Sequence, residues 1–177
     1  IINLLGCLIH SIIYIFISIY IMFWTKKAND DYSTPVEYLA IINKFIPQDS
    51  IICDPFYNDG LVVDEWKKLQ RDIIHDHTDF FDTEYQCDIF VSNPPFSIIN
   101  KVLKKLFELD KPFAILIPIQ KIAQLKVQSL LKNKNMQLVV CNIYIGFLKD
   151  GKRTRCPSQY FAWVCYRMDL PRDLVFV

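Results

Sequence analysis

The chain has 177 residues, of which 52% are hydrophobic and 14% aromatic, and its formal net charge at pH 7 is +1. This length fits one domain, and the apolar content is ample for a packed core, which excludes an intrinsically disordered protein. The near-neutral total charge favours no particular class of partner.

The charge is distributed unevenly along the chain. Residues 28–96 carry 4 Lys and Arg against 14 Asp and Glu, whereas residues 97–155 carry 12 against 3. Such an asymmetry is typical of proteins in which one part faces a polyanion. It favours a nucleic-acid partner for the second half, and the alternative is a set of solvated faces with no partner.

The six cysteines show no CxxC pair and no His spacing that would hold zinc. We therefore expect small buried side chains in a reducing compartment, cytoplasmic or nuclear, and no metal site. The residues concerned are Cys7, Cys53, Cys87, Cys141, Cys156 and Cys165.

Residues 1–24 form an apolar, uncharged stretch that is followed by Lys26 and Lys27. By length it would span a bilayer. The lack of an initial Met, and the abundance of residues that AT-rich codons encode, favour in-frame sequence upstream of a start at Met22. A genuine membrane anchor and the tail of a truncated upstream domain are the alternatives. The folded domain is predicted at residues 28–177.

From residue 28 onward, helical and strand patterns alternate with short connections. The first helix is predicted within residues 32–47, with Thr34 as N-cap, Pro35 at the first helical position and Glu37 completing a capping box. Further helices are predicted at 61–69, 98–109 and 121–131. Apolar strands are predicted at 50–54, 72–75, 88–92, 112–118, 136–142 and 161–167.

Continuous apolar strands that alternate with helices indicate a doubly wound α/β domain with a mostly parallel sheet. We expect an antiparallel hairpin at its C-terminal end. Two polar motifs follow predicted strands: DPFYNDG at 54–60 and NPPF at 93–96. Because such sheets bind ligands at the carboxyl ends of their strands, both motifs are expected along one crevice.

The paired motifs resemble those of S-adenosylmethionine-dependent methyltransferases that modify exocyclic or amide nitrogens, chiefly adenine N6 in DNA, in compact viral or phage-like forms. In that family, Asp-Pro and a short loop ending in Gly accompany (Asn/Asp/Ser)-Pro-Pro-(Tyr/Phe/Trp) at a strand end. The resemblance covers residues 32–167. It implies a Rossmann-like class I methyltransferase fold, S-adenosylmethionine as cofactor and a nucleic-acid substrate, DNA in preference to RNA.

The chemistry of methylating an exocyclic amine accounts for the second motif. The lone pair of such an amine is delocalised into the ring, so the amine is a poor nucleophile. The Asn93 side-chain oxygen and the Pro94 carbonyl would accept its two N–H bonds and turn the lone pair outward. Pro95 stiffens the turn, and Phe96 would stack on an extruded base. The alternative is a structural turn with Phe96 in the core.

The resemblance also implies a cofactor site around the first motif. The loop from Asp54 to Gly60 would pass beneath the methionine part, with Asp54 holding the amino group. An acidic residue after the second strand would bind the ribose, and an Asp-Phe pair would flank the adenine. The family usually carries small residues where this chain has Phe56, Tyr57, Asn58 and Asp59. The implied cofactor contacts are Thr34, Pro35, Asp54, Pro55, Phe56, Gly60, Asp76, Asp79 and Phe80.

Substrate recognition is assigned to residues 146–160, because the chain has no room for a separate recognition domain. A basic, aromatic-edged hairpin is predicted there, which suits phosphate contact and base stacking, and a solvated turn is the alternative. They are Lys149, Lys152, Arg153, Arg155 and Tyr160. Alternative functions are methylation of adenine or guanine in RNA, glutamine methylation of a protein, and a non-catalytic methyltransferase-like subunit that binds nucleic acid.

Overall fold

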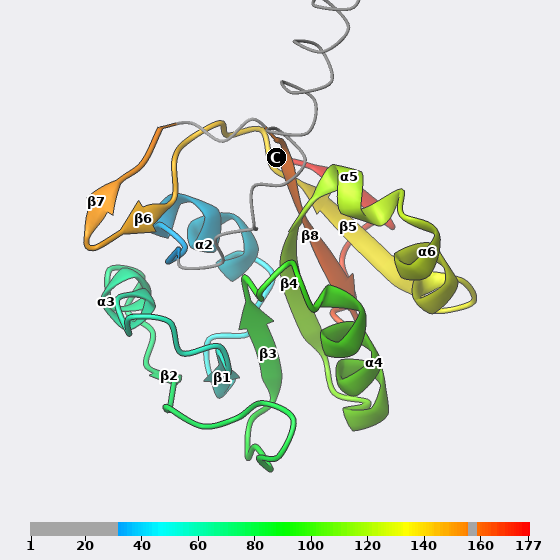
Figure 1. The fold of residues 1–177 in the computed structure, drawn as a ribbon, viewed down its shortest axis with the longest axis horizontal. Coiled ribbons are helices and arrows are strands. Elements are labelled where there is room, and N and C mark those ends of the chain that lie inside the picture. The colour runs from blue at the N-terminus through cyan, green and yellow to red at the C-terminus, as the bar shows by residue number, and fades with distance from the viewer. Residues whose placement is uncertain (1–31, 156–158) are drawn as a thin grey trace, which may run out of the picture.

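The computed structural model describes residues 32–155 and 159–177 (Figure 1). The apolar stretch at residues 1–24 lies outside the described residues, as do Cys7 and Cys156. The other four cysteines are buried free thiols, as predicted. Within the described ranges, no helix combines the length and apolar character needed to cross a membrane.

A seven-stranded sheet forms the centre of the molecule, in the order β2-β1-β3-β4-β8-β5-β9. Strand β8 runs antiparallel to its neighbours β4 and β5, and the other pairs are parallel. The predicted mostly parallel α/β sheet is therefore confirmed, with β5 and β8 as its C-terminal antiparallel pair. The strands are β1 (Ile52–Cys53), β2 (Ile73–Ile74), β3 (Ile89–Ser92), β4 (Phe113–Pro118), β5 (Met136–Val140), β8 (Phe161–Tyr166) and β9 (Leu174–Phe176).

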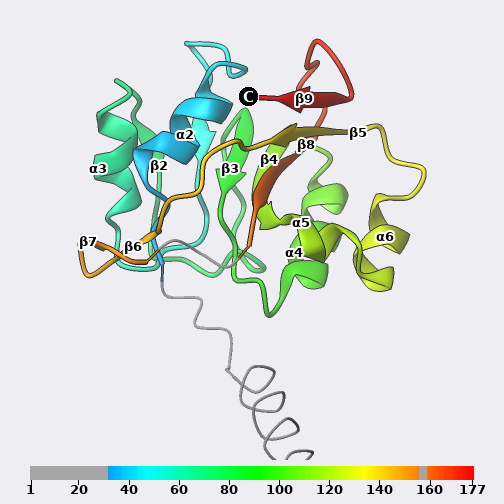
Figure 2. The same ribbon diagram turned by 90° about the horizontal axis from the view of Figure 1, so that it is seen from above.

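Helices cover both faces of the sheet (Figure 2). Helices α2 (Val36–Asn43) and α3 (Val62–Lys67) pack on one face, where Val91, Leu116 and Trp163 point. On the other face, Phe90, Ile115 and Val164 meet the remaining helices. The alternation of neighbouring residues between the two cores follows from the two-residue period of a strand. The remaining helices are α4 (Ile99–Leu109), α5 (Ile119–Ile122) and α6 (Leu125–Leu131).

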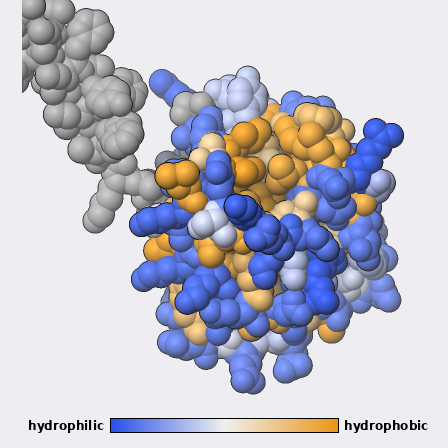
Figure 3. Space-filling view, turned by 90° about the vertical axis from the view of Figure 1, so that its right-hand side faces the viewer, coloured by the Kyte–Doolittle hydropathy of each residue, from blue (hydrophilic) through white to orange (hydrophobic). Residues whose placement is uncertain are grey.

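The helix predicted at 121–131 is two helices, α5 and α6. Gln124, between them, has an extended backbone with φ −73° and ψ 132°, which interrupts the helical hydrogen bonds. The change of direction buries Val127 completely and leaves Leu125 at 84% exposure. Figure 3 shows apolar side chains gathered in the upper part of one face of the molecule, with hydrophilic ones around them.

The predicted capping box of the first helix is wrong. Helix α2 begins at Val36, and its N-cap Pro35 makes no side-chain capping bond. The Val36 N–H instead donates to Glu65 Oε2 of α3 at 2.8 Å, and Glu37 forms an ion pair with Arg153. The reason is tertiary: Ser33 pairs with Leu148 as an antiparallel bridge, which holds the chain extended before the helix.

Of two short pairings, the hairpin within residues 146–160 was predicted and strand β9 was not. Strand β6 (Leu148–Lys149) forms a hairpin with β7 (Lys152–Arg153), and β9 pairs with β5 at the sheet edge. Each strand has two or three residues, which is shorter than the apolar runs that mark a strand in a sequence. They exist because a neighbouring segment supplies hydrogen bonds.

Candidate functional site

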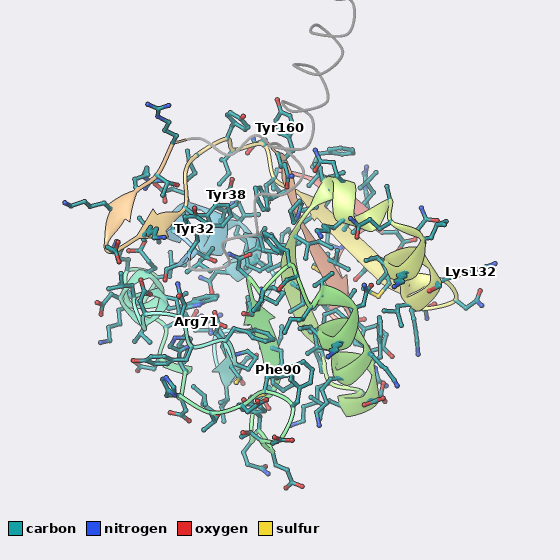
Figure 4. All side chains as sticks on the ribbon, in the orientation of Figure 1. Tyr32, Tyr38, Arg71, Phe90, Lys132 and Tyr160 are labelled. Atoms are coloured by element: carbon teal, nitrogen blue, oxygen red, sulfur yellow. The ribbon has the colours of Figure 1, made fainter. Side chains whose placement is uncertain are left out.

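The two motifs lie side by side at the carboxyl edge of the sheet. Strands β1 and β3 are parallel neighbours, with Cys53 opposite Phe90, so Asp54 and Asn93 follow adjacent strands. A narrow pocket opens here, and Tyr32, one of its lining residues, is labelled in Figure 4. Its lining includes four of the predicted site residues, Thr34, Asp54, Phe56 and Asn93, together with Tyr32, Ser33, Asn58, Val62 and His75.

Asp54 is a buried carboxylate with hydrogen-bond donors around it. Its side chain is 5% exposed, and its Oδ1 accepts hydrogen bonds from Ser92 Oγ at 2.5 Å and from the Phe56 N–H at 3.3 Å. Burial raises the pKa of Asp54 to about 6, while nearby His75 and the hydrogen bond from Ser92 oppose that rise. When ionised, this carboxylate is suited to a cationic ligand group.

Two further acceptors face the same pocket. His75 Nδ1 lies 2.8 Å from the Asp54 carbonyl oxygen, so Nδ1 carries a proton, and in the neutral ring Nε2 is the acceptor. Within the described part of the chain, His75 Nε2 and Asn93 Oδ1 are buried and have no hydrogen-bond partner. Buried acceptors without donors are rare in folded proteins. A carboxylate, an imidazole nitrogen and an amide oxygen together suit a ligand rich in N–H and O–H donors.

The other residues of the NPPF motif form the turn between β3 and α4. Pro94 is buried, and Pro95 and Phe96 are half-buried. The Phe96 ring centroid lies 6.1 Å from that of Phe161, so the ring packs partly against the core. Lys121 Nζ donates to the Phe96 carbonyl oxygen at 3.4 Å.

Gly60 permits the conformation of the loop after β1. Its φ is +75°, and a Cβ atom there would lie 2.8 Å from Tyr57 Oη. The Tyr57 ring stacks on His75, with centroids 4.9 Å apart. Pro55 is buried, and the Phe56 ring lies 5.0 Å from Phe80. Gly60 therefore makes room for Tyr57.

The segment before α2 joins the pocket to this loop. Thr34 is 3% exposed within the pocket lining, and Pro35 caps α2. Ser33 Oγ donates to Asp59 Oδ1 at 2.5 Å, which ties the segment to the loop.

Six predicted cofactor contacts lie outside the pocket lining: Pro35, Pro55 and Gly60, described above, and Asp76, Asp79 and Phe80. Asp76 and Asp79 are exposed, and Asp79 Oδ1 accepts a hydrogen bond from the Phe81 N–H at 2.7 Å in a tight turn. Phe80 is 3% exposed and packs against Phe56 and Phe90 in the core. Phe80 therefore touches the site only through Phe56.

The basic hairpin lies against the segment that lines the pocket. Ser33 and Leu148 exchange two backbone hydrogen bonds, each 2.9 Å long. Lys149 Nζ lies 5.6 Å from the Tyr32 ring centroid, and Arg153 Nη2 lies 2.7 Å from Glu37 Oε1. The remaining predicted recognition residues, Lys152, Arg155 and Tyr160, are exposed.

Sequence reasoning missed the part that Ser92 and His75 play. Ser92 ends β3 and reads as an ordinary strand residue, yet it holds the Asp54 carboxylate. His75 belongs to no recognised motif of the sequence, yet it holds the Asp54 backbone. The signal for both is the adjacency of β1 to β2 and β3, which is visible only once the strand order is known.

No protein-family model matches the chain, and neither does any curated protein. Among solved structures, it is similar to a precorrin-6y C5,15-methyltransferase from Geobacter metallireducens, with TM-score 0.49 and 9% identity, over 79% of this chain and 97% of that one. It is also similar to a ribosomal protein L11 methylase from Lactobacillus delbrueckii subsp. bulgaricus, with TM-score 0.42 and 16% identity, over 75% of this chain and 65% of that one. Likeness at this level does not indicate what the chain binds or catalyses.

Proposed function

We propose that the chain transfers a methyl group from S-adenosylmethionine to an exocyclic amino nitrogen of a nucleic-acid base, adenine N6 in DNA. The observation that carries the proposal is the pocket at the carboxyl ends of β1 and β3. There the buried Asp54 carboxylate and the Asn93 oxygen, which has no partner within the described ranges, line the same pocket. One acceptor suits the ammonium group of the cofactor, and the other suits the amine to be methylated.

In this proposal, each motif residue has a separate task. Asn93 Oδ1 and the Pro94 carbonyl accept the two N–H bonds of the target amine and stabilise the positive charge that develops on it. Phe96 stacks on the extruded base. Asp54 binds the amino group of the cofactor, whose sulfonium supplies the methyl group. The remaining cofactor contacts are assigned to Thr34, Pro35, Pro55, Phe56 and Gly60 along the loop, and to Asp76, Asp79 and Phe80 beyond it.

The hairpin supports a nucleic-acid substrate. Strand β6 is hydrogen-bonded to the residue before Thr34, so its cations stand beside the pocket. Lys149, Lys152, Arg155 and the exposed Tyr160 suit phosphate and base contacts.

A non-catalytic nucleic-acid-binding subunit is the second candidate. Tyr57, in a glycine-poor loop, stacks on His75, which lines the pocket. Among the described residues, the Asn93 oxygen has no donor and also lines the pocket, which favours the enzyme.

The decisive experiment incubates the protein with methyl-labelled S-adenosylmethionine and separate DNA, RNA and protein pools. We expect label in DNA adenine. Asn93→Ala should lower kcat about 10²-fold while cofactor affinity stays near that of the native protein, because the lost acceptor organises only the target amine.

Asn100→Ala is the matched control. Asn100 Oδ1 is also buried and unpartnered within the described residues, but Asn100 lies on α4 outside the pocket lining. Full turnover by Asn93→Ala would refute the catalytic assignment. If label appears only in RNA or only in protein, the assignment of DNA as the substrate is wrong. Nucleic-acid binding without cofactor binding would favour the non-catalytic subunit.

A further inference from the structure

Tyr160 has an aromatic neighbour, Tyr144, that the sequence did not indicate. Tyr144 lies in the loop after β5, and Tyr160 comes directly before β8. Their ring centroids are 5.3 Å apart and the ring planes are inclined by 39°. Tyr144 is 45% exposed and Tyr160 is 59% exposed. Two large rings from different segments of the chain therefore present aromatic surface to solvent at one place.

The tyrosine pair lies at the carboxyl end of β4, next to the turn that carries the NPPF motif. Pro118, the last residue of β4, is paired with Phe161, and the Ile119 N–H donates to the Tyr160 carbonyl oxygen at 2.9 Å. The ring centroid of Phe161, the residue after Tyr160, lies 6.1 Å from that of Phe96. Figure 4 labels Tyr160 at the upper edge of the molecule. The pair is therefore close to the turn that is proposed to hold the target base.

The charges around the pair favour a polyanionic ligand. Residues 111–168, which include both tyrosines, contain ten Lys and Arg and a single acidic residue, Asp150. One of these cations, Lys121 of α5, contacts the Phe96 carbonyl oxygen through Nζ at 3.4 Å and so stands beside the motif. Exposed rings among cations are the combination that binds unpaired nucleic-acid strands, because bases stack on the rings while the cations contact phosphates.

We propose that Tyr144 and Tyr160 form a stacking platform for an unpaired base next to the target base. The inference rests on the proposed function and names its substrate class, which is single-stranded DNA in preference to duplex DNA. A base that stacks on an exposed ring has to separate from its neighbour in the strand. In a duplex this separation adds the cost of unstacking and unpairing a second nucleotide, whereas a single strand avoids most of that cost.

The test measures binding of a short single-stranded DNA with one adenine by fluorescence anisotropy, in the presence of S-adenosylhomocysteine. Tyr144→Ala and Tyr160→Ala should each weaken binding about 5- to 100-fold, the range for loss of a ring that stacks on a base. Tyr144→Phe and Tyr160→Phe are the matched controls, and they should retain most of the affinity because they keep the ring. The slope of log K against log salt should stay the same in all four variants, because no cation is removed.

A change in the DNA tests the same contact without altering the protein. An abasic nucleotide next to the adenine keeps the phosphate and removes the base, and it is placed on each side in turn. On the side that meets the platform, it should weaken binding by the native protein and leave binding by Tyr160→Ala unchanged, because the stacking is already lost. The duplex of the same sequence should bind the native protein at least about 10-fold more weakly than the single strand.

Methyl transfer to the same oligonucleotide, measured in parallel, separates this inference from the proposed function. Methyl transfer by the native protein, together with native affinity in both Ala variants, would overturn the platform alone. Equal losses in the Ala and Phe variants, or a duplex that binds as tightly as the single strand, would do the same. If the native protein neither binds the DNA nor methylates it, the proposed function and the platform are both wrong.

Discussion

Ionisation of Asp54, a residue of the candidate site, lowers the free energy of unfolding. Its carboxyl group is buried, and burial raises its pKa from the ordinary 3.8 to about 6. Between these pH values the folded state binds a proton that the unfolded state has lost. The free energy of unfolding therefore falls as pH rises through that window, by about 3 kcal/mol in total.

Asp54→Asn should remove this loss, because the amide does not ionise. We expect the free energy of unfolding of the variant, relative to the native protein, to increase by about 3 kcal/mol between pH 4 and pH 7, measured by urea denaturation. Cofactor binding should be lost at the same time. In Ser92→Ala, the free energy of unfolding should continue to fall up to a higher pH, since the hydrogen bond from Ser92 lowers the pKa of Asp54. Parallel pH profiles for Asp54→Asn and the native protein would contradict the assignment.

Gly60 tests how the loop after β1 is packed. Gly60→Ala should lower the free energy of unfolding by about 1–3 kcal/mol, because the residue has φ +75° and a Cβ would meet the Tyr57 hydroxyl. Gly151→Ala is the matched control: its φ is +70°, but nothing lies within 4 Å of its Cβ position. If thermal or urea denaturation gives the same loss of unfolding free energy for both variants, the contact with Tyr57 adds nothing to the cost of Gly60→Ala.

At the scale of elements, helix α2 depends on α3 for its first turn. Glu65→Ala should cost about 1 kcal/mol, because it removes the acceptor of the Val36 N–H, whereas Glu65→Gln keeps an acceptor and should cost less. Glu37→Ala should cost about 0.5 kcal/mol or less, since its ion pair with Arg153 is exposed. Urea denaturation of the three variants measures these changes in the free energy of unfolding. A larger loss for Glu37→Ala than for Glu65→Ala would support the predicted capping box instead.

The helices and strands that have long, regular apolar patterns were predictable. Strand β4 and helix α4 follow their patterns closely, since every residue of β4 is buried and α4 buries one stripe. Features that depend on a neighbouring segment of the same chain were not predictable. Strand β9 needs β5, the contact between the β6–β7 hairpin and Ser33 joins segments far apart in the chain, and the break before α6 depends on which side chains the sheet can bury.

On the scale of the whole molecule, the acidic and the basic parts of the sequence form different halves of the sheet. Residues 28–96 form β2, β1 and β3 with α2 and α3, whereas residues 97–155 form α4, β4, α5, α6 and β5. The basic hairpin departs from this division, because it returns to the acidic half and pairs beside the pocket (Figure 1).

The hairpin should therefore carry the salt dependence of nucleic-acid binding. Replacing Lys152, Arg153 and Arg155 with Gln should reduce the slope of log K against log salt by up to about three phosphate contacts. Lys152 and Arg155 should account for about two of them, because Arg153 is paired with Glu37. S-adenosylmethionine affinity should stay the same.

Fluorescence titration of a short oligonucleotide at several salt concentrations measures that slope. Lys101→Gln with Lys104→Gln is the matched control, because these exposed lysines lie on α4 over the opposite face of the sheet from α2. An unchanged slope in the hairpin variant would mean that the hairpin is a solvated turn.

The sequence by itself determined the α/β class and the positions of the two motifs, because apolar periodicity and proline turns are local properties of the chain. It also indicated that Asp54 and Asn93 follow strands. Only the tertiary structure decided which strands are neighbours, and therefore that Ser92 and His75 hold Asp54. Strand order placed Asp76, Asp79 and Phe80 outside the pocket lining and brought a hairpin from residues 148–153 against Ser33. Such contacts arise between segments far apart in the chain, where no local pattern records them.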